Sequence, residues 1–148
     1  MKHLTLILIL AISFGACRKG RDQSEIDRDI IVKYINDHQI QANATASGLY
    51  YVIEKEGTGS NPSVASTVTV VYKGYLADGS VFDQSDAAGA TFGLSQTIAG
   101  WQEGIPLFKK GGSGKLFVPS ALGYGPGGNG KIPGNAVLIF DIQLLNIK

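Results

Sequence analysis

Residues 67–76 read TVTVVYKGYL, and this stretch decides the fold class because its side chains alternate with the two-residue period of a β-strand. Val68, Val70 and Tyr72 point to one face, whereas polar side chains such as Thr69 point to the other. The alternation predicts a strand with one apolar and one polar face. The 20 glycines of the chain favour further strands joined by tight turns.

Other strands are predicted before and after this stretch, over Leu49–Glu56, Lys115–Pro119 and Ala136–Ile147. In the last of them, every second residue from Leu138 to Leu144 is apolar, so these side chains share one face. The main domain is therefore expected to be a sheet built from segments that are far apart in the sequence.

One short helix is predicted between these strands, within Gly100–Lys110. Pro106 lacks a backbone donor and tends to kink a helix, so about two turns are expected. Gly111 and Gly112 supply the C-terminal end. Antiparallel strands wrapped on one short helix define an α+β half-barrel, which is the predicted fold class.

The residues before this domain predict an amphipathic helix from Ser24 to His38. Ser24 is a suitable N-cap residue, and Asp27 is an acid in the first turn. An isolated helix of this length is marginal in water, so its apolar stripe must cover something. We expect it to cover the chain's own sheet, with a dimer contact as the alternative. The stripe consists of Ile26, Ile30, Ile31, Tyr34 and Ile35.

Residues 1–16 are typical of an export signal. Their eleven-residue apolar stretch Leu4–Phe14 is shorter than the about 20 residues that a membrane span needs. The run Phe14-Gly15-Ala16-Cys17 resembles a bacterial lipobox, so lipidation of Cys17 is expected, which would anchor the chain to a membrane of a bacterial cell envelope. The alternative is an incidental cysteine. The predicted organisation is a signal (1–16), a tether with the amphipathic helix (17–47) and the main domain (48–148).

Charge and composition exclude several functions. Removal of residues 1–16 takes away Lys2 and no acid, which leaves 12 Lys and Arg against 12 Asp and Glu. A chain of zero net charge without a long basic run gives no electrostatic reason to expect nucleic acid as a partner. Cys17 is the sole cysteine, so no intramolecular disulfide can form.

Motifs for nucleotide, metal and hydrolytic chemistry are absent or misplaced. Gly125-x-Gly127-x-x-Gly130 matches a dinucleotide fingerprint, but it carries Pro126 and leads into a strand, where that motif needs a helix. The chain has two histidines, His3 and His38, and His3 lies in the signal. No metal site, cofactor or Ser-His-Asp triad is therefore expected.

Five short motifs follow one another in the main domain. They are Tyr72, Val81-Phe82-Asp83, Thr97-Ile98-Ala99-Gly100-Trp101, Ala121-Leu122-Gly123-Tyr124-Gly125 and Val137-Leu138-Ile139-Phe140-Asp141. In this order and at these spacings, residues 49–148 resemble the FKBP family of peptidyl-prolyl cis-trans isomerases. The resemblance implies the half-barrel fold, isomerisation of Xaa-Pro bonds in exported polypeptides, and proline-containing polypeptides as partners. Macrolide ligands are a further partner class that it implies.

The resemblance also implies roles for individual residues. Trp101 would form the floor under the proline ring, and the Ile98 amide and the Tyr124 hydroxyl would each hold a substrate carbonyl. Asp83 would meet the twisting amide or orient Tyr72. The catalytic set is Phe82, Asp83, Ile98 and Tyr124, and the substrate-binding set is Tyr72, Thr97, Trp101, Ile132 and Phe140.

Plainer interpretations of these residues remain open. Trp101 or Phe140 taken alone would be a core residue, and Asp83 a turn acid. Residues 84–100 offer no Arg to pair with Asp83, and Ala90 stands near the expected place of a further pocket aromatic. These two departures bear more on macrolide affinity than on isomerisation. They keep a second function class open, a non-catalytic chaperone or scaffold module that binds proline-containing segments.

Overall fold

The computed structural model describes residues 20–148, so the predicted signal and Cys17 lie outside the described residues. Its elements are, in chain order, α1 (Gln23–Asp37), β1 (Asn43–Ala44), β2 (Tyr50–Lys55), β3 (Thr67–Leu76), β4 (Val81–Gln84), β5 (Ala90–Gly93), η1 (Leu94–Gln96), α2 (Ala99–Gly104), η2 (Ile105–Leu107), β6 (Ser113–Val118), η3 (Ser120–Leu122), η4 (Gly125–Gly127) and β7 (Leu138–Ile147), where η denotes a short 3₁₀ helix.

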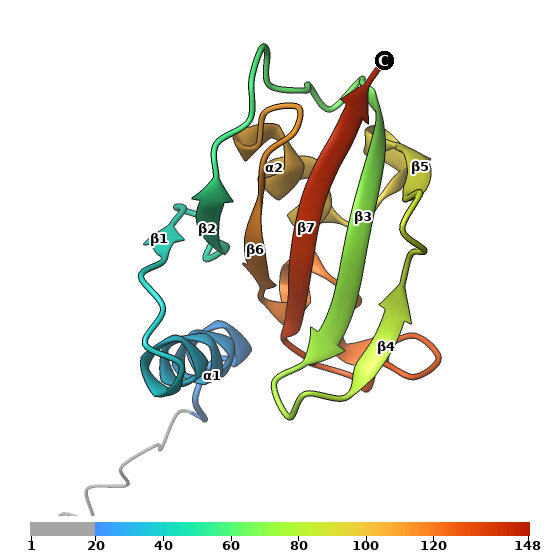
Figure 1. Cartoon of the computed structure of the whole chain (residues 1–148). Coiled ribbons are helices and arrows are strands. Elements are labelled where there is room, and N and C mark those ends of the chain that lie inside the picture. The colour runs from blue at the N-terminus through green and yellow to red at the C-terminus, as the bar shows by residue number, and fades with distance from the viewer. Residues whose placement is uncertain (1–19) are drawn as a thin grey trace, which may run out of the picture.

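The strands form one antiparallel sheet with β3 and β7 at its centre (Figure 1). The order is β1-β2-β6-β7-β3-β4, and β5 also pairs with β3. The first half of β3 pairs with β5, and the second half pairs with β4. Because β3 and β7 have ten residues each, they run the full length of the sheet and place residues at both of their ends.

The two helices pack on opposite faces of the sheet (Figure 1). On one face, Trp101 of α2 and the following Ile105 lie in the core with Leu116, Phe140 and Leu144. On the other face, α1 packs against alternate residues of the same strands. Because successive side chains of a strand point to opposite faces, β6 and β7 contribute residues to the core on both faces of the sheet.

The packing of α1 confirms that its apolar stripe covers the chain's own sheet. Ile31 and Ile35 are buried together with Phe117 and Ile139. The predicted stripe is too wide, however, because Ile30 is 36% exposed on the outer side of the helix. Of the five residues in the predicted stripe, only Ile31 and Ile35 are buried.

Two expectations about the start of α1 are wrong. The N-cap is Asp22, and Ser24 is already inside the helix, where its hydroxyl donates to the Asp22 carboxylate over 3.2 Å. Asp27 does not lie in the first turn, because the helix begins at Gln23; it is 1% exposed and binds Ser120 on a different element. A contact between residues so far apart in sequence leaves no local signal.

The predicted short helix exists, but it ends earlier than expected. Helix α2 stops at Gly104, and Ile105–Leu107 continues as a 3₁₀ turn that contains Pro106. The missing backbone donor of proline explains the change of geometry. The four predicted strands agree with β2, β3, β6 and β7 within about two residues at each end, whereas β1, β4 and β5 were not predicted.

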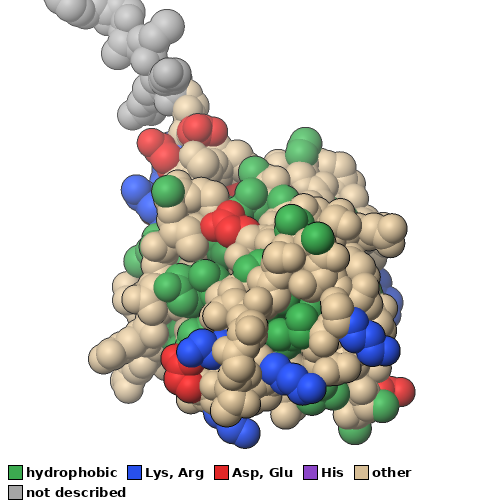
Figure 2. Space-filling model, turned by 90° about the horizontal axis from the view of Figure 1, so that it is seen from above, with side chains coloured by type: hydrophobic (Ala, Val, Ile, Leu, Met, Phe, Trp, Pro, Cys, Tyr) green, Lys and Arg blue, Asp and Glu red, His purple; other side chains and the backbone are tan. Residues whose placement is uncertain are grey.

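The described surface carries both signs of charge. Viewed from above, acidic and basic side chains lie among hydrophobic and neutral ones, with several Lys and Arg side chains along one border (Figure 2). Within residues 20–148, neither helix has the length and apolar character that crossing a membrane would require.

Candidate functional site

A cavity of about 620 Å³ opens between α2, the adjacent face of the sheet and the loop that precedes β7. Side chains from β3, β4, β5 and β7 form its walls, and residues 124–132 form one side of its mouth. Its lining consists of Tyr72, Phe82, Asp83, Phe92, Gln96, Thr97, Ile98, Trp101, Tyr124, Asn129, Lys131, Ile132 and Phe140.

Trp101 lies at the centre of an aromatic cluster in this cavity. The centroid of its indole lies 5.2 Å from that of Tyr72 and 5.4 Å from those of Phe92 and Phe140, with the rings edge to face in each pair. Phe82 extends the cluster through an edge contact with Phe140 at 5.6 Å. Edge-to-face pairs at these distances are favourable and hold the rings in fixed orientations. The cluster therefore forms a preformed apolar surface.

A glycine on β3 permits two of these rings to meet. Gly74 pairs with Asp83 on one side and with Phe140 on the other. A Cβ at this position would lie 2.6 Å from the Phe82 ring and 2.9 Å from the Phe140 ring. Real Cβ atoms essentially never approach so closely, so the absence of a side chain at Gly74 makes room for this wall of the cavity.

The polar part of the cavity is centred on Asp83. The Tyr72 hydroxyl donates to Asp83 Oδ2 over 2.7 Å, and the Gln84 backbone N–H donates to Asp83 Oδ1 over 2.9 Å. Partial burial, and then the hydrogen bond to Asp83, raise the pKa of Tyr72 to about 12. The phenol is therefore neutral near pH 7 and stays a donor to the carboxylate. Of the two predicted roles of Asp83, the orientation of Tyr72 corresponds to a contact that is present.

Two polar groups at the mouth are free for a ligand. The Ile98 carbonyl accepts from the Trp101 and Gln102 backbone N–H groups, whereas the Ile98 N–H has no acceptor among residues 20–148. Tyr124 is 38% exposed, and its hydroxyl has no hydrogen-bond partner within the same described residues. A donor from each side of the mouth can therefore meet carbonyl groups of an extended peptide.

The structure brings together all nine residues that the sequence predicted for the site, because each of them lines the same cavity. Sequence reasoning missed Phe92, Gln96, Asn129 and Lys131 as lining residues. The alternation of Phe92 with Leu94 was a sequence signal for a strand here, but strand β5, which places Phe92 against Trp101, was not expected. Phe92 thus provides a further pocket aromatic two residues beyond Ala90.

The described residues contain no group of three or more His, Cys, Asp or Glu side chains that could hold a metal ion. Trp101 Nε1 is the one buried side-chain nitrogen or oxygen in residues 20–148 that has no hydrogen-bond partner. The aromatic cluster at the floor of the cavity is therefore apolar apart from this one N–H group.

An antiparallel half-barrel with an aromatic cavity over a short helix is the arrangement expected of the family that the sequence resembles. Residues 59–145 match the family model described as FKBP-type peptidyl-prolyl cis-trans isomerase. The chain belongs to this family, which confirms the expectation drawn from the five ordered motifs.

Individual relatives agree with this assignment. The chain is 50% identical over 107 residues to FkpA, an FKBP-type peptidyl-prolyl cis-trans isomerase of Aeromonas hydrophila. The matched residues make up 71% of this chain and 40% of that protein. It is 48% identical over 105 residues to the outer membrane protein MIP of Legionella longbeachae, covering 69% of this chain and 45% of that protein. The crystal structure of FkpA from Escherichia coli superimposes with a TM-score of 0.72 and 35% identity, covering 85% of this chain and 62% of the other. The chain thus spans about two fifths of the length of the first curated relative.

Proposed function

We propose that this chain catalyses cis–trans isomerisation of peptidyl-prolyl bonds in exported polypeptides. The observation that carries the proposal is the aromatic cavity around Trp101, which is large enough for a proline ring and apolar at its floor. Family membership supports the same reaction.

The reaction needs little chemistry from the protein. Rotation about a peptide bond costs about 18–20 kcal/mol because the planar amide has double-bond character. The planar form is strongly dipolar and well solvated, whereas the twisted form has less charge separation. Transfer of the bond from water into an apolar cavity therefore penalises the ground state more than the transition state. A thousandfold acceleration needs only about 4 kcal/mol of such a difference.

The groups at the mouth would fix the substrate while its proline is in the cavity. The free Ile98 N–H and the exposed Tyr124 hydroxyl would each hold a substrate carbonyl, so that one side of the bond stays in place while the other rotates. Asp83 would act through Tyr72, whose ring forms part of the wall. Thr97 supports this geometry, because its hydroxyl donates to the Leu94 carbonyl over 2.7 Å and fixes the turn before Ile98.

The hydrogen bonds of Asp83 favour a second function, which is binding of proline-containing segments without useful turnover. Its carboxylate already accepts two hydrogen bonds, and no Lys or Arg lies within ion-pair distance of it among the described residues. A ligand could occupy the aromatic cavity without any group acting on the amide.

A protease-coupled assay with proline peptides that carry an apolar residue before proline separates the two functions. We expect the purified chain to accelerate isomerisation, to be unaffected by EDTA and to be inhibited by any macrolide that binds the cavity. A chain that binds the same peptides, measured through the fluorescence of Trp101, but gives no rate above the uncatalysed one would be a binding module.

Attachment to a bacterial envelope is the cellular part of the proposal. It rests on the signal-like residues 1–16 and on Cys17, and it agrees with the name of the outer membrane relative. Cys17→Ala should move the protein from the membrane fraction to the soluble periplasmic fraction or leave it unprocessed. An unmodified mature N-terminus at another residue would exclude the lipid anchor.

A further inference from the structure

The N-terminal helix α1 lies outside the residues that match the family model, yet it holds a buried carboxylate. Asp27 is 1% exposed. Its Oδ2 accepts from the Ser120 backbone N–H over 2.8 Å and from the Ser120 hydroxyl over 2.6 Å, and its Oδ1 accepts from Gln23 Nε2 over 2.7 Å. Both contacts to Ser120 join residues 93 positions apart.

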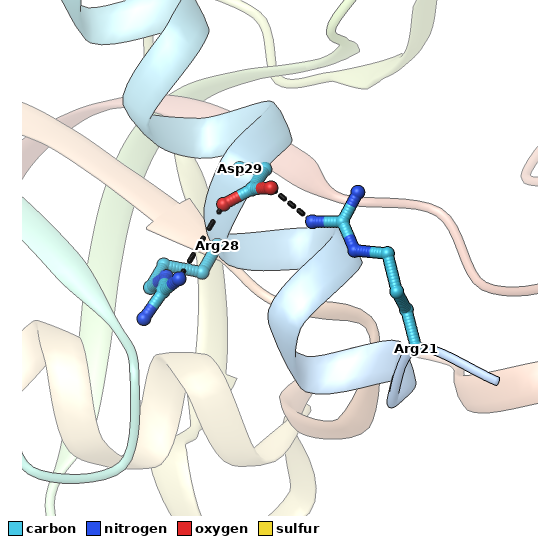
Figure 3. Close-up of polar contacts among 3 residues, drawn as sticks. All are labelled: Arg21, Arg28 and Asp29. Carbon is cyan, nitrogen blue, oxygen red and sulfur yellow. Dashed lines mark hydrogen bonds and ion pairs between the residues drawn. The ribbon is translucent and has the colours of Figure 1, made fainter. Parts of the chain in front are cut away.

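A second acid on the same helix shows how unusual this environment is. Asp29 lies at the surface and forms ion pairs with Arg21 and Arg28 (Figure 3), and the hydrogen bond from Arg21 lowers its pKa. Asp27 has no such cation within reach among residues 20–148. A carboxylate without a cation is costly to bury, so it is a poor means of adding stability. What it provides is a fixed position for the donors that bind it.

Ser120 is the point where the loop of the cavity begins. It is the first residue of η3, and its carbonyl accepts from the Gly123 N–H over 3.0 Å, which closes the turn. Tyr124 follows directly and lines the mouth of the cavity, and Asn129 and Ile132 line it further along the same loop. Asp27 accepts from both the backbone N–H and the hydroxyl of Ser120, so α1 is joined to the loop at its first residue.

The same region also contacts α2. A Cβ on Gly100 would lie 2.4 Å from Val118 and 3.3 Å from the Leu122 carbonyl oxygen, so α2 packs directly on the end of β6 and on η3. The segment between α1 and β2 adds a second connection, because the Ser47 hydroxyl donates to Glu103 of α2 over 2.7 Å. A displacement of η3 would therefore change the packing of α2 beside Trp101 as well as the position of Tyr124.

We propose that Asp27 is a positioning residue, through which α1 fixes Ser120 and so places the loop that carries Tyr124 over the cavity. The N-terminal helix is thereby part of the functional unit, although its side chains do not reach the cavity. The effect on turnover rests on the proposed isomerase function, whereas the effect on the loop does not.

The test compares four single variants of the full chain. Asp27→Ala removes the acceptor. Asp27→Asn keeps a carbonyl oxygen that can accept from Ser120 without the charge. Asp29→Ala removes an exposed acid from the same helix, and Ile35→Ala removes packing of α1 on the sheet while keeping Asp27 and Ser120. Thermal unfolding measures the stability of each variant, and every other measurement is made well below its melting temperature.

Three readouts follow the loop and the cavity, and the protease-coupled assay measures kcat/KM. Backbone and side-chain NMR signals of Ser120, Tyr124 and Ile132 report the loop, the Trp101 indole signal reports the floor, and a proline peptide titration reports binding. We expect Asp27→Ala to shift the loop signals and to lower kcat/KM about three- to tenfold. Asp27→Asn should keep the loop signals and kcat/KM close to the wild-type values, and Asp29→Ala should leave both unchanged.

Unchanged loop signals in Asp27→Ala would overturn the proposal, because Asp27 would then contribute only to folding. Equal loop shifts in Ile35→Ala would overturn it as well, since any loosening of α1 would then suffice. Failure of the proposed function looks different: the wild-type chain would give no isomerisation, while the loop signals would still separate Asp27→Ala from its controls.

Discussion

The two faces of the sheet are built from the same strands but have opposite character. On the α1 face, aliphatic side chains such as Ile31 and Ile139 pack closely against Phe117, and a 15-residue helix covers them. On the α2 face, a six-residue helix covers only part of the sheet, and aromatic rings that meet edge to face surround a cavity. Close packing is the normal state of a protein interior. The difference shows that the cavity results from a short helix combined with rigid rings that cannot collapse into it.

Neighbouring residues of β7 give the strongest test of this difference. Phe140 faces the cavity side and Ile139 faces α1, and both are at least 96% buried. Phe140→Ala should cost about 3–5 kcal/mol of unfolding free energy and also weaken peptide binding. Ile139→Ala should cost about 2–5 kcal/mol but leave binding unchanged in the folded fraction. Denaturant unfolding combined with peptide titration checks both, and equal binding losses would show that the two faces are not independent.

Gly100 tests whether the approach of α2 sets the size of the cavity. An added Cβ would meet Val118 at 2.4 Å, so Gly100→Ala should cost about 1–3 kcal/mol and tilt Trp101 away from its aromatic partners. The emission maximum of this single tryptophan measures the change. Gly127→Ala is the control, because a Cβ there would meet nothing within 4 Å. A wild-type spectrum for Gly100→Ala would show that the helix can shift without disturbing the floor.

Asp83 and Tyr124 test the polar rim against the aromatic floor. Asp83→Ala should lower kcat/KM by about an order of magnitude, or about 1.4 kcal/mol, because Tyr72 loses its hydrogen-bond partner. Tyr124→Phe should cost less, since it removes one hydroxyl and keeps the ring. Peptide assays on both variants check the order. A larger loss for Tyr124→Phe would assign the main polar role to the loop.

The smallest expected effect concerns pH. The folded pKa of Tyr72, about 12, lies above the ordinary tyrosine value of 10.0, so its stabilising contribution is complete below pH 10 and is lost as the pH rises toward 12. Stability of the wild type relative to Tyr72→Phe should therefore fall over this window, while kcat/KM stays level near pH 7. Unfolding measured at several alkaline pH values checks this. A constant difference would mean that Tyr72 titrates normally.

Much of the domain follows from the sequence because its signals are local. Alternation along residues 67–76 and from Leu138 onward predicted β3 and β7, since a strand turns successive side chains to opposite faces. The resemblance to the FKBP family, which the ordered motifs carry, implied which residues share the cavity, and all nine line it. Pro106 was correctly expected to disturb the short helix, although the helix ends sooner than predicted.

Tertiary structure alone decided the features that depend on distant partners. The four-residue strand β5 is ordered by pairing with β3, so a short segment with little periodicity of its own brings Phe92 into the cavity. The sequence assigned Asp27 to the first turn of the helix, because sequence shows residue type and spacing but not which donors the fold brings near. Its burial against Ser120 exists only once α1 lies on the sheet. Local period therefore determined the strands, whereas long-range packing determined how the N-terminal helix meets the loop of the cavity.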